Sequence, residues 1–417
     1  MSNAISHPAH IGQGLHVARA TGHYPASWIA SILMASVCYL ALLSFANARG
    51  LQVSPVWVGL VETLVYLACL IAQIRRVPLV TVALSCCVFA WVVFSWLIRQ
   101  SPDLKGLRDL IIPILFVSLG RYVADVRFAD VALKRIVLVL VVLGLFEALF
   151  TDAYGRLFNT FSFYVNLGGI RESSAMFEGQ MLTLNGFRPE GIGRTIFPGL
   201  LGAHRTSSAL MEPVSLGNFG VILLAWALSR SWKNMRHAVP FLLGAALLIA
   251  LSDSRFGLAV GAVLIALRCV PLAVLTRLAP AIPFLSLGIV IALASLLPGA
   301  GDNVLGRITR SGTPLLDFDW AMILGLHGPL PNFGDMGFAY VISRFGAPLC
   351  IGLILAIFMV PMPDARGLRF RIFVVVYIFA NFAVSGTSVF ALKTAGVMWF
   401  LFGVLSAASA LPKRSSV

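Results

Sequence analysis

The sequence predicts an all-α integral membrane protein with about twelve transmembrane helices. Of the 417 residues, 59% are hydrophobic and only 12% are charged, whereas about 25% of the residues in a soluble domain are charged. Apolar runs that approach the roughly 20 residues needed to cross a bilayer recur from Trp28 to Leu411. Helices are the expected spanning element, because backbone groups exposed to lipid must be satisfied within the protein.

Each apolar run is assigned to one span, and the fourth, fifth and seventh are the shortest. In order, the runs cover residues 28–46, 55–74, 78–98, 109–123, 136–150, 211–229, 238–253, 256–275, 279–298, 337–361, 370–386 and 389–411. The membrane domain therefore extends over residues 28–411, between an N-terminal tail of residues 1–27 and a C-terminal tail of residues 412–417.

Basic residues between the spans predict the orientation. The chain has 31 Lys and Arg residues against 17 Asp and Glu, and most of the basic clusters fall on one side if the spans alternate. The cytoplasmic side carries such an excess, so both tails are predicted to be cytoplasmic. Segments 151–208 and 299–336 then lie outside, in the periplasm of a Gram-negative cell. Because topology accounts for the positive charge, the sequence does not favour a nucleic-acid partner.

The loop 99–108 departs from this rule. It carries Arg99, Lys105 and Arg108, yet the alternation places it outside. Either a span is miscounted or re-entrant, or these residues form an extra basic rim around an external anionic site.

Segment 151–208 is the one long break among the spans. It mixes phenylalanines and arginines with several glycines. This composition predicts short amphipathic helices that lie on the membrane and are joined by glycine turns. Such a segment could cover a cavity and move.

The residues predict no metal, no cofactor and no disulfide. All six cysteines fall inside apolar runs, and no CxxC pair or Cys/His cluster exists. The four histidines of the N-terminal tail are irregularly spaced in a polar segment, which favours disorder over metal binding, and the tail lacks the apolar core of a signal peptide. No P-loop, dinucleotide-binding, zinc-protease or serine-hydrolase motif is present.

Arg205 and Arg255 are the first candidates for a functional site, because topology does not explain basic residues at the external ends of helices. Arginine grips a phosphate through two parallel hydrogen bonds and keeps its charge, so two arginines could hold a diphosphate without a metal. Alternatively, each side chain extends toward lipid headgroups or pairs with a neighbour such as Asp253.

Three residues are candidates for proton transfer. Glu212 begins a span, where the helix dipole favours a carboxylate, and it could instead orient Arg205 or accept a proton. His327 lies in a Gly- and Pro-containing loop, and a histidine suits general-base work at neutral pH, although a loop histidine is commonly an ordinary polar residue. Asp335 is either an N-cap of the next helix or part of the site.

Charged residues inside the spans are expected to face the protein interior. Arg344 falls within a span, and an unpaired charge facing lipid is costly. Glu147 and Lys393 lie near the outer ends of their spans and could line the same cavity. Glu62 lies deeper in its span and receives no assigned role.

Three short stretches resemble a known family. Residues 205–213 (Arg-Thr-Ser-Ser-Ala-Leu-Met-Glu-Pro) are similar to the end of the large periplasmic loop in O-antigen and exopolysaccharide polymerases. Residues 251–255 (Leu-Ser-Asp-Ser-Arg) resemble the SxSR signature of the O-antigen polymerase/ligase superfamily. Residues 324–338, followed by Gly346, resemble its third block, a glycine-rich loop before an Asp-x-Gly-aromatic helix start. The expected spans and large loop are also similar to the family.

The resemblance implies a GT-C-like membrane enzyme and points to a Wzy-type repeat-unit polymerase. Ligases of the superfamily typically carry a histidine-asparagine pair where this chain has Asp335 and Met336, with His327 eight residues earlier. The implied reaction is metal-independent, inverting glycosyl transfer at the periplasmic face of the inner membrane. The implied partners are an undecaprenyl-diphosphate-linked oligosaccharide, membrane lipids and a chain-length regulator or flippase of the same pathway.

The resemblance also implies roles for individual residues. Basic side chains would bind the diphosphate of the donor and stabilise the charge that develops as it leaves. One residue would deprotonate the acceptor hydroxyl. The diphosphate-binding candidates are Arg205, Arg255 and Arg344, and the candidates for the base are His327, Glu212 and Asp335.

Three alternatives stay open. The protein could be an O-antigen ligase that transfers glycan to lipid A-core, a polysaccharide transporter or flippase, or a non-catalytic assembly partner. A transporter is expected to show broken helices in paired positions and an internal repeat, which the sequence does not display. Clustering of Arg205, Arg255 and His327 around one external cavity would favour an enzyme.

Overall fold

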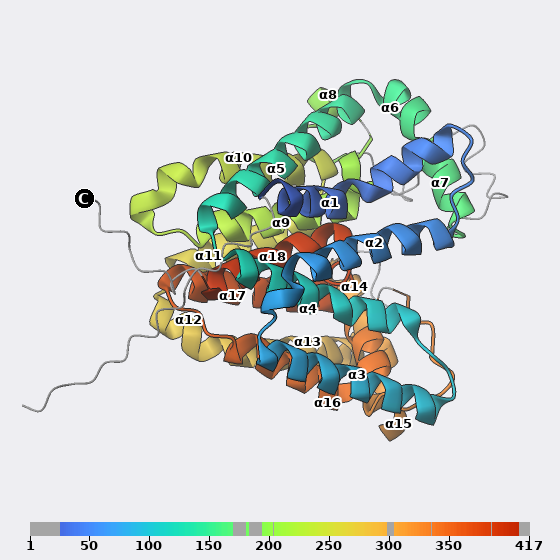
Figure 1. The fold of residues 1–417 in the computed structure, drawn as a ribbon, viewed down its shortest axis with the longest axis vertical. Helices are drawn as coiled ribbons and strands as arrows, with labels where there is room; N and C mark the ends of the chain where they lie inside the picture. The colour runs from blue at the N-terminus through green and yellow to red at the C-terminus, as the bar shows by residue number, and fades with distance from the viewer. Residues whose placement is uncertain are drawn as a thin grey trace, which may run out of the picture.

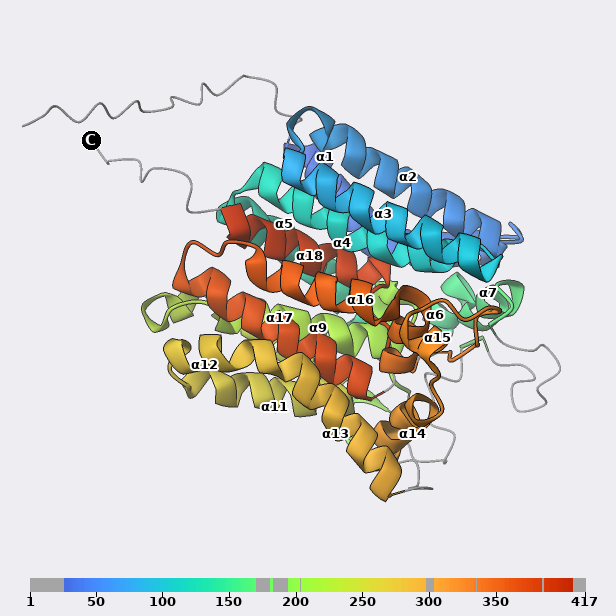
Figure 2. The same cartoon turned by 90° about the horizontal axis from the view of Figure 1, so that it is seen from below.

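The computed structural model describes residues 26–169, 181–182, 194–202, 204–297, 304–334, 336–384 and 386–407. Within these residues all the regular structure is helical, and the long helices run side by side in one bundle (Figure 1, Figure 2). The predicted all-α class is therefore confirmed.

Helices occupy each of the twelve apolar runs. They are α1 (Ala26–Ala48), α2 (Pro55–Gln73), α3 (Leu79–Arg99), α4 (Leu104–Val123), α5 (Val126–Leu149), α9 (Pro213–Leu228), α10 (Val239–Ser252), α11 (Arg255–Cys269), α12 (Leu272–Leu278) with α13 (Ile282–Leu296), α16 (Gly337–Met359), α17 (Ala365–Ala383) and α18 (Leu392–Ala407).

Five of the described helical segments are long and apolar enough to cross a membrane, namely α1, α2, α3, Leu272–Leu296 and α16. A sixth is added if α5 is joined to the following short helices, which bend away from it by 115°. The total of twelve spans remains a prediction.

Short helices connect the long ones. The described part of segment 151–208 contains some of the short helices that its composition predicted, and residues 170–180, 183–193 and 203 lie outside the described residues. The short elements are α6 (Thr151–Phe158), α7 (Thr160–Asn166), α8 (Pro198–Leu201), α14 (Val304–Leu316), α15 (Trp320–Ile323), η1 (Ile74–Arg76), η4 (Ser208–Leu210), η5 (Trp232–His237) and η6 (Ala279–Ala281).

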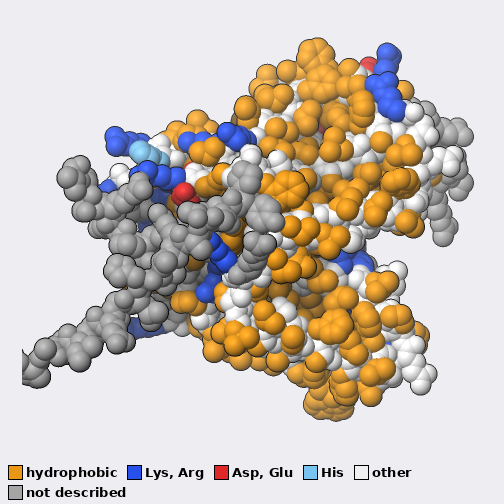
Figure 3. Space-filling model, in the orientation of Figure 1, with side chains coloured by type: hydrophobic (Ala, Val, Ile, Leu, Met, Phe, Trp, Pro, Cys, Tyr) orange, Lys and Arg blue, Asp and Glu red, His pale blue; other side chains and the backbone are white. Residues whose placement is uncertain are grey.

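Large apolar side chains cover much of the outer surface. Leu79, Leu97 and Met359 are 82%, 72% and 79% exposed, and hydrophobic side chains dominate the face drawn in Figure 3. Single exposed leucines are ordinary in soluble proteins, but contiguous apolar surface on this scale marks contact with lipid or a partner. The surface and the apolar helices together describe a membrane-embedded helical protein.

The core is built around α9 and α18, which are buried on nearly every face. Helix α18 lies closest to α4. A Cβ atom added at Gly120 would collide with the carbonyl oxygen of Phe400, and one added at Gly403 would collide with that of Val117. Small residues that let helix backbones approach in this way are typical of packing inside membranes.

The bundle has two distinct ends. The end that carries α6, α7, α14 and α15 is called the loop end, and the end where the described chain begins at Ala26 and finishes at Ala407 is called the terminal end (Figure 2). Side-chain contacts join elements at the loop end, for example from Ser44 Oγ to Phe158 O at 2.6 Å. The described parts of segments 151–208 and 299–336 lie at the same end of the bundle, as the alternation of spans predicted.

Candidate functional site

Two polar clusters lie at the loop end. The turn cluster surrounds the connection between α10 and α11 and consists of Glu147, Arg194, 204–212, 252–255 and Lys393. The break cluster surrounds an interruption in α16 and consists of Arg99, 103–109, 324–328, 340–346 and Glu62. The sequence-predicted site residues that the structure describes divide between them.

The centre of the turn cluster is a tight connection between two helices. Helix α10 ends at Ser252, and Asp253 adopts a left-handed conformation with φ of 49°. Ser254 then caps α11, because its Oγ accepts a hydrogen bond from Gly257 N at 2.9 Å. Arg255 is therefore the first residue of α11, at a helix end that favours anions.

The buried side chain of Asp253 connects this turn to residues 195 and 196. Its side chain is fully buried, and Oδ1 accepts hydrogen bonds from Thr195 N at 3.0 Å, Thr195 Oγ1 at 2.8 Å and Ile196 N at 2.8 Å. The sequence offered Asp253 as a partner for an arginine, and the structure shows it binding the 195–196 backbone.

Arg194 ties the same turn to the segment that follows. Its guanidinium donates to Ala250 O at 2.7 Å, to Leu251 O at 2.8 Å and to His204 O at 2.6 Å. Burial lowers the pKa of Arg194, and the charges of Asp253 and Glu147 oppose that shift. A guanidinium surrounded by backbone carbonyls acts as a structural tie, a role that the sequence analysis missed.

Glu147 anchors the segment that carries Arg205. It lies in the last turn of α5 and is fully buried. Its carboxylate accepts hydrogen bonds from Ser207 N at 2.8 Å, Ser207 Oγ at 3.0 Å and Ser208 N at 2.6 Å, and it lies 2.8 Å from His204 Nε2. Four contacts from one short segment fix its backbone on α5.

Arg205 and Arg255 flank the same turn. Arg205 is half-buried, and its Nε donates to Ser252 O at 3.1 Å. Arg255 is exposed, and within the described part of the chain its side chain makes no hydrogen bond or ion pair. The structure therefore brings together two of the predicted diphosphate-binding residues and presents one of them to the surroundings.

Glu212 also belongs to the turn cluster. It stands immediately before α9, and its Oε2 accepts from Lys393 Nζ at 2.8 Å and from Ser215 Oγ at 2.7 Å. Lys393 donates as well to Leu210 O at 3.1 Å. Glu147 and Lys393, which were expected to share a cavity, instead hold the 207–212 segment from two different helices.

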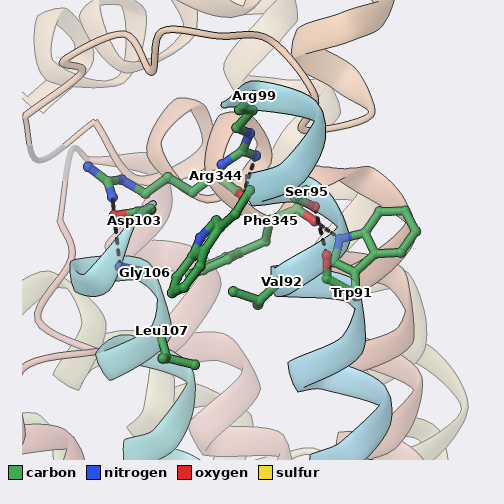
Figure 4. Close-up of a pocket in the computed structure, with 10 residues that line it drawn as sticks. Trp91, Val92, Ser95, Arg99, Asp103, Gly106, Leu107, Arg344 and Phe345 are labelled. Atoms are coloured by element: carbon green, nitrogen blue, oxygen red, sulfur yellow. Dashed lines mark hydrogen bonds and ion pairs between the residues drawn. The ribbon is translucent and has the colours of Figure 1, made fainter. Parts of the chain in front are cut away.

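The break cluster forms where α16 loses its helical conformation at Gly346, with φ of 74° and ψ of 151°. Arg99, from the end of α3, donates to Ser343 O at 3.0 Å, to Arg344 O at 2.6 Å and to Gly325 O. Trp91 Nε1 donates to Phe345 O at 2.8 Å. Side chains of α3 thus satisfy the carbonyl groups that the break releases, as Figure 4 shows for Arg99 and Trp91.

Arg344 is engaged inside this cluster. Its guanidinium forms an ion pair with Asp103 and lies 4.5 Å from the ring centre of Tyr340. As predicted it faces the interior, with a side chain only 15% exposed. The adjoining cavity, of about 10 Å³, has room for a water molecule but not for a diphosphate (Figure 4).

The basic residues of loop 99–108 now have an explanation. Arg99 binds the carbonyl groups at the break, and Lys105 lies 4.9 Å from the ring centre of Tyr340. Arg108 pairs with Asp109 at 2.9 Å and with Glu62 at 3.5 Å. Each is bound to neighbours, so the loop does not present a free basic rim.

His327 belongs to the break cluster. Its loop packs against the break, because a Cβ added at Gly325 would collide with Gly346 and one added at Gly328 would collide with the backbone of Arg99. His327 is half-buried, and its Nδ1 has no hydrogen-bond partner among the described residues. The structure thus separates the predicted base from the two arginines of the turn cluster.

One segment contacts both clusters. The ring centre of Phe390 lies 6.0 Å from that of Phe345 and 6.3 Å from that of Tyr340, and Lys393, three residues later, binds Glu212. Asp335, the third candidate base, lies outside the described residues, and Met336 occupies the N-cap position of α16.

No group of three or more His, Cys, Asp or Glu side chains gathers as a metal site in the part of the chain that the structure describes.

Comparisons of the sequence and the structure with known proteins found no matching family model, no matching curated protein and no matching solved structure.

Proposed function

We propose that this protein polymerises undecaprenyl-diphosphate-linked oligosaccharide repeat units by metal-independent, inverting glycosyl transfer. The turn cluster is the active site of the proposal. The loop end would then face the periplasm of the inner membrane, as the basic loops of the sequence predict.

The observation that carries the proposal is that Arg205 and Arg255 flank the same turn, the connection between α10 and α11. Arg255 is exposed at the start of α11 and is not engaged by any described residue, while buried Glu147, Arg194 and Asp253 fix the backbone beneath it. Because the backbone is fixed before the reaction, the guanidinium starts from a defined position from which it can stabilise a departing diphosphate.

The proposed step exchanges one bond at the anomeric carbon. The acceptor hydroxyl oxygen attacks this carbon as the bond to the diphosphate oxygen breaks, and the configuration inverts. The electron pair of the broken bond leaves with the diphosphate, where the arginines stabilise it. The hydroxyl proton passes to a base. Glu212 is the leading candidate, because it belongs to the turn cluster, whereas His327 belongs to the break cluster and Asp335 lies outside the described residues.

Arg344 leaves the diphosphate-binding set of the proposal. Its guanidinium is engaged by Asp103 and lies beside a cavity that is too small for a diphosphate. In the proposal, His327 lies on the acceptor side, because segment 390–393 contacts both clusters.

The break in α16 bears on the transporter alternative. In transporters, the carbonyl groups at a broken helix coordinate a transported cation. Here the guanidinium of Arg99 donates to those carbonyl groups, so the chain supplies its own cation. This arrangement argues against a transporter that binds its cation at the break in α16.

The test is polymer formation by the purified protein in detergent with synthetic undecaprenyl-diphosphate repeat units. Arg255→Ala is expected to lower the rate about 100- to 1,000-fold, as for removal of one preorganised donor. Arg255→Lys should retain part of the rate, because lysine still binds phosphate as a point charge. A chelator should leave the rate unchanged.

Arg277→Ala is the matched control, since Arg277 is an exposed arginine near the terminal end. A product ladder that survives Arg255→Ala would refute the diphosphate role of this arginine. Transfer to lipid A-core without a ladder would identify a ligase. If the protein catalyses neither reaction with a matched substrate, the enzyme assignment is refuted.

A further inference from the structure

A second candidate site lies at the terminal end, away from both clusters. A groove of about 430 Å³ opens between the first turns of α1 and α5. On one side it is lined by the small residues Ala26, Ser27 and Ala30, and on the other by α5. Its volume is in the range of small-molecule sites.

The wall formed by α5 is both basic and apolar. Arg127 and Arg135 line the groove together with Phe128 and Val131. Both arginines are exposed, and neither side chain makes a hydrogen bond or ion pair with another described residue. The acidic residue of the lining, Asp125, is engaged by the helix itself, because its Oδ1 accepts from Arg127 N at 2.8 Å.

The groove is continuous with the apolar surface of the bundle. Trp28 on α1 is 42% exposed, and Val131 and Leu138 on α5 are 49% and 63% exposed. An occupant must therefore combine a hydrocarbon portion beside these residues with a negative charge beside the arginines. A membrane phospholipid with an anionic headgroup has this combination, and basic pockets between transmembrane helices bind such lipids.

We propose that this groove binds one anionic phospholipid of the surrounding membrane. The phosphate lies between Arg127 and Arg135, beside Val131 on the same face of α5, and an acyl chain follows the apolar surface past Leu138. The gap opposite α5 exists because Ala26, Ser27 and Ala30 are small, so the site depends on shape as well as charge. This inference does not rest on the proposed glycosyl transfer.

Native mass spectrometry of the purified, delipidated full chain tests the site. The protein is titrated with phosphatidylglycerol and, separately, with phosphatidylcholine. Phosphatidylglycerol is expected to bind at one tight site, and the double variant Arg127→Ala/Arg135→Ala should bind it about 25-fold more weakly, at about fivefold for each arginine. Arg277→Ala, which removes an exposed charge outside the groove, should change the affinity less than about twofold.

A second variant separates the groove from general surface charge. Ala30→Phe fills the groove and keeps both arginines, so it should weaken phosphatidylglycerol binding as much as the double variant does. If Ala30→Phe does not fold, Val131→Trp fills the groove from the α5 side.

Equal binding of the two lipids, or unchanged affinity in the double variant or in the filled groove, would overturn the proposal. Full displacement of the lipid by millimolar inorganic phosphate would also overturn it, because the site would then select a free phosphate.

Discussion

The two clusters at the loop end use arginine in opposite ways. In the break cluster, Arg99 and Arg344 are themselves the groups that hold the structure together, one on backbone carbonyls and the other on Asp103. In the turn cluster, buried Glu147 and Arg194 hold the backbone, while Arg255 stays exposed.

This difference shows that residue type and position at a helix end do not distinguish a structural arginine from a binding arginine. The deciding quantity is how far the protein satisfies the guanidinium with its own acceptors. Arg99 is buried against three backbone carbonyl oxygens and is closed to a ligand, whereas Arg255 is exposed on a fixed turn and keeps all its donors.

The largest expected effect on stability comes from the scaffold of the turn cluster. Glu147→Ala leaves two backbone N–H groups and the side chains of His204 and Ser207 without their buried acceptor, so we expect a loss of about 4 kcal/mol. Thermal unfolding in detergent measures it. Asp152→Ala, which removes an exposed carboxylate from the neighbouring helix, is the control and should be nearly silent. Similar melting of the two variants would show that Glu147 is not the anchor.

A glycine pair tests the break in the same way. Gly346→Ala forces a side chain onto a backbone with φ of 74° and against the carbonyl oxygen of Leu324, so we expect destabilisation of about 3 kcal/mol. Gly352, one helical segment later, has open space around it, and Gly352→Ala should be neutral or stabilise by up to about 1 kcal/mol. Thermal melts of both variants decide whether the break is required, and a stable Gly346→Ala protein would argue that α16 tolerates a continuous helix.

Substituting one arginine in each cluster has the smallest expected effect on stability and compares the two clusters directly. Arg344→Met breaks a largely buried ion pair and should destabilise the protein by about 2 kcal/mol, whereas Arg255→Met should change stability by less than about 0.5 kcal/mol. The proposed activity should respond in the opposite order to stability. Melting curves and polymer assays on the same preparations measure both, and a destabilised Arg255→Met protein would place that arginine among the structural ones.

Much of the fold was predictable because apolar runs have a direct physical meaning in a membrane. Helices occupy each of the twelve predicted runs, and the position of Arg255 at a helix end followed from those boundaries. Arg205 was also expected at a helix end, but it lies in the non-helical stretch 204–207 before α9. The anchoring role of Glu147 was not predictable, since it depends on hydrogen bonds with a segment 57 to 61 positions away.

The roles of the basic residues in loop 99–108 also depend on contacts with distant segments, so they could not be predicted. From the sequence alone, Arg99 and Arg255 look alike, each a basic residue at the external end of a span. What separates them is the break at Gly346, which supplies acceptors to Arg99. Gly346 and Pro348 mark that break in the sequence, but no local pattern connects it with Arg99. His327 was grouped with the arginines because all three share one predicted face, and a shared face does not imply a shared cavity.

The close contact between α4 and α18 has a consequence for how the protein is made. The carbonyl groups of Val117 and Phe400 face glycines on the opposite helix. Helix α4 is therefore synthesised long before its partner α18, which is the last of the described helices. At about 5–20 residues per second, this interval lasts on the order of tens of seconds after α4 leaves the ribosome. During this time the glycine face of α4 lacks its native partner, so the contact between α4 and α18 forms only late in the synthesis of the chain.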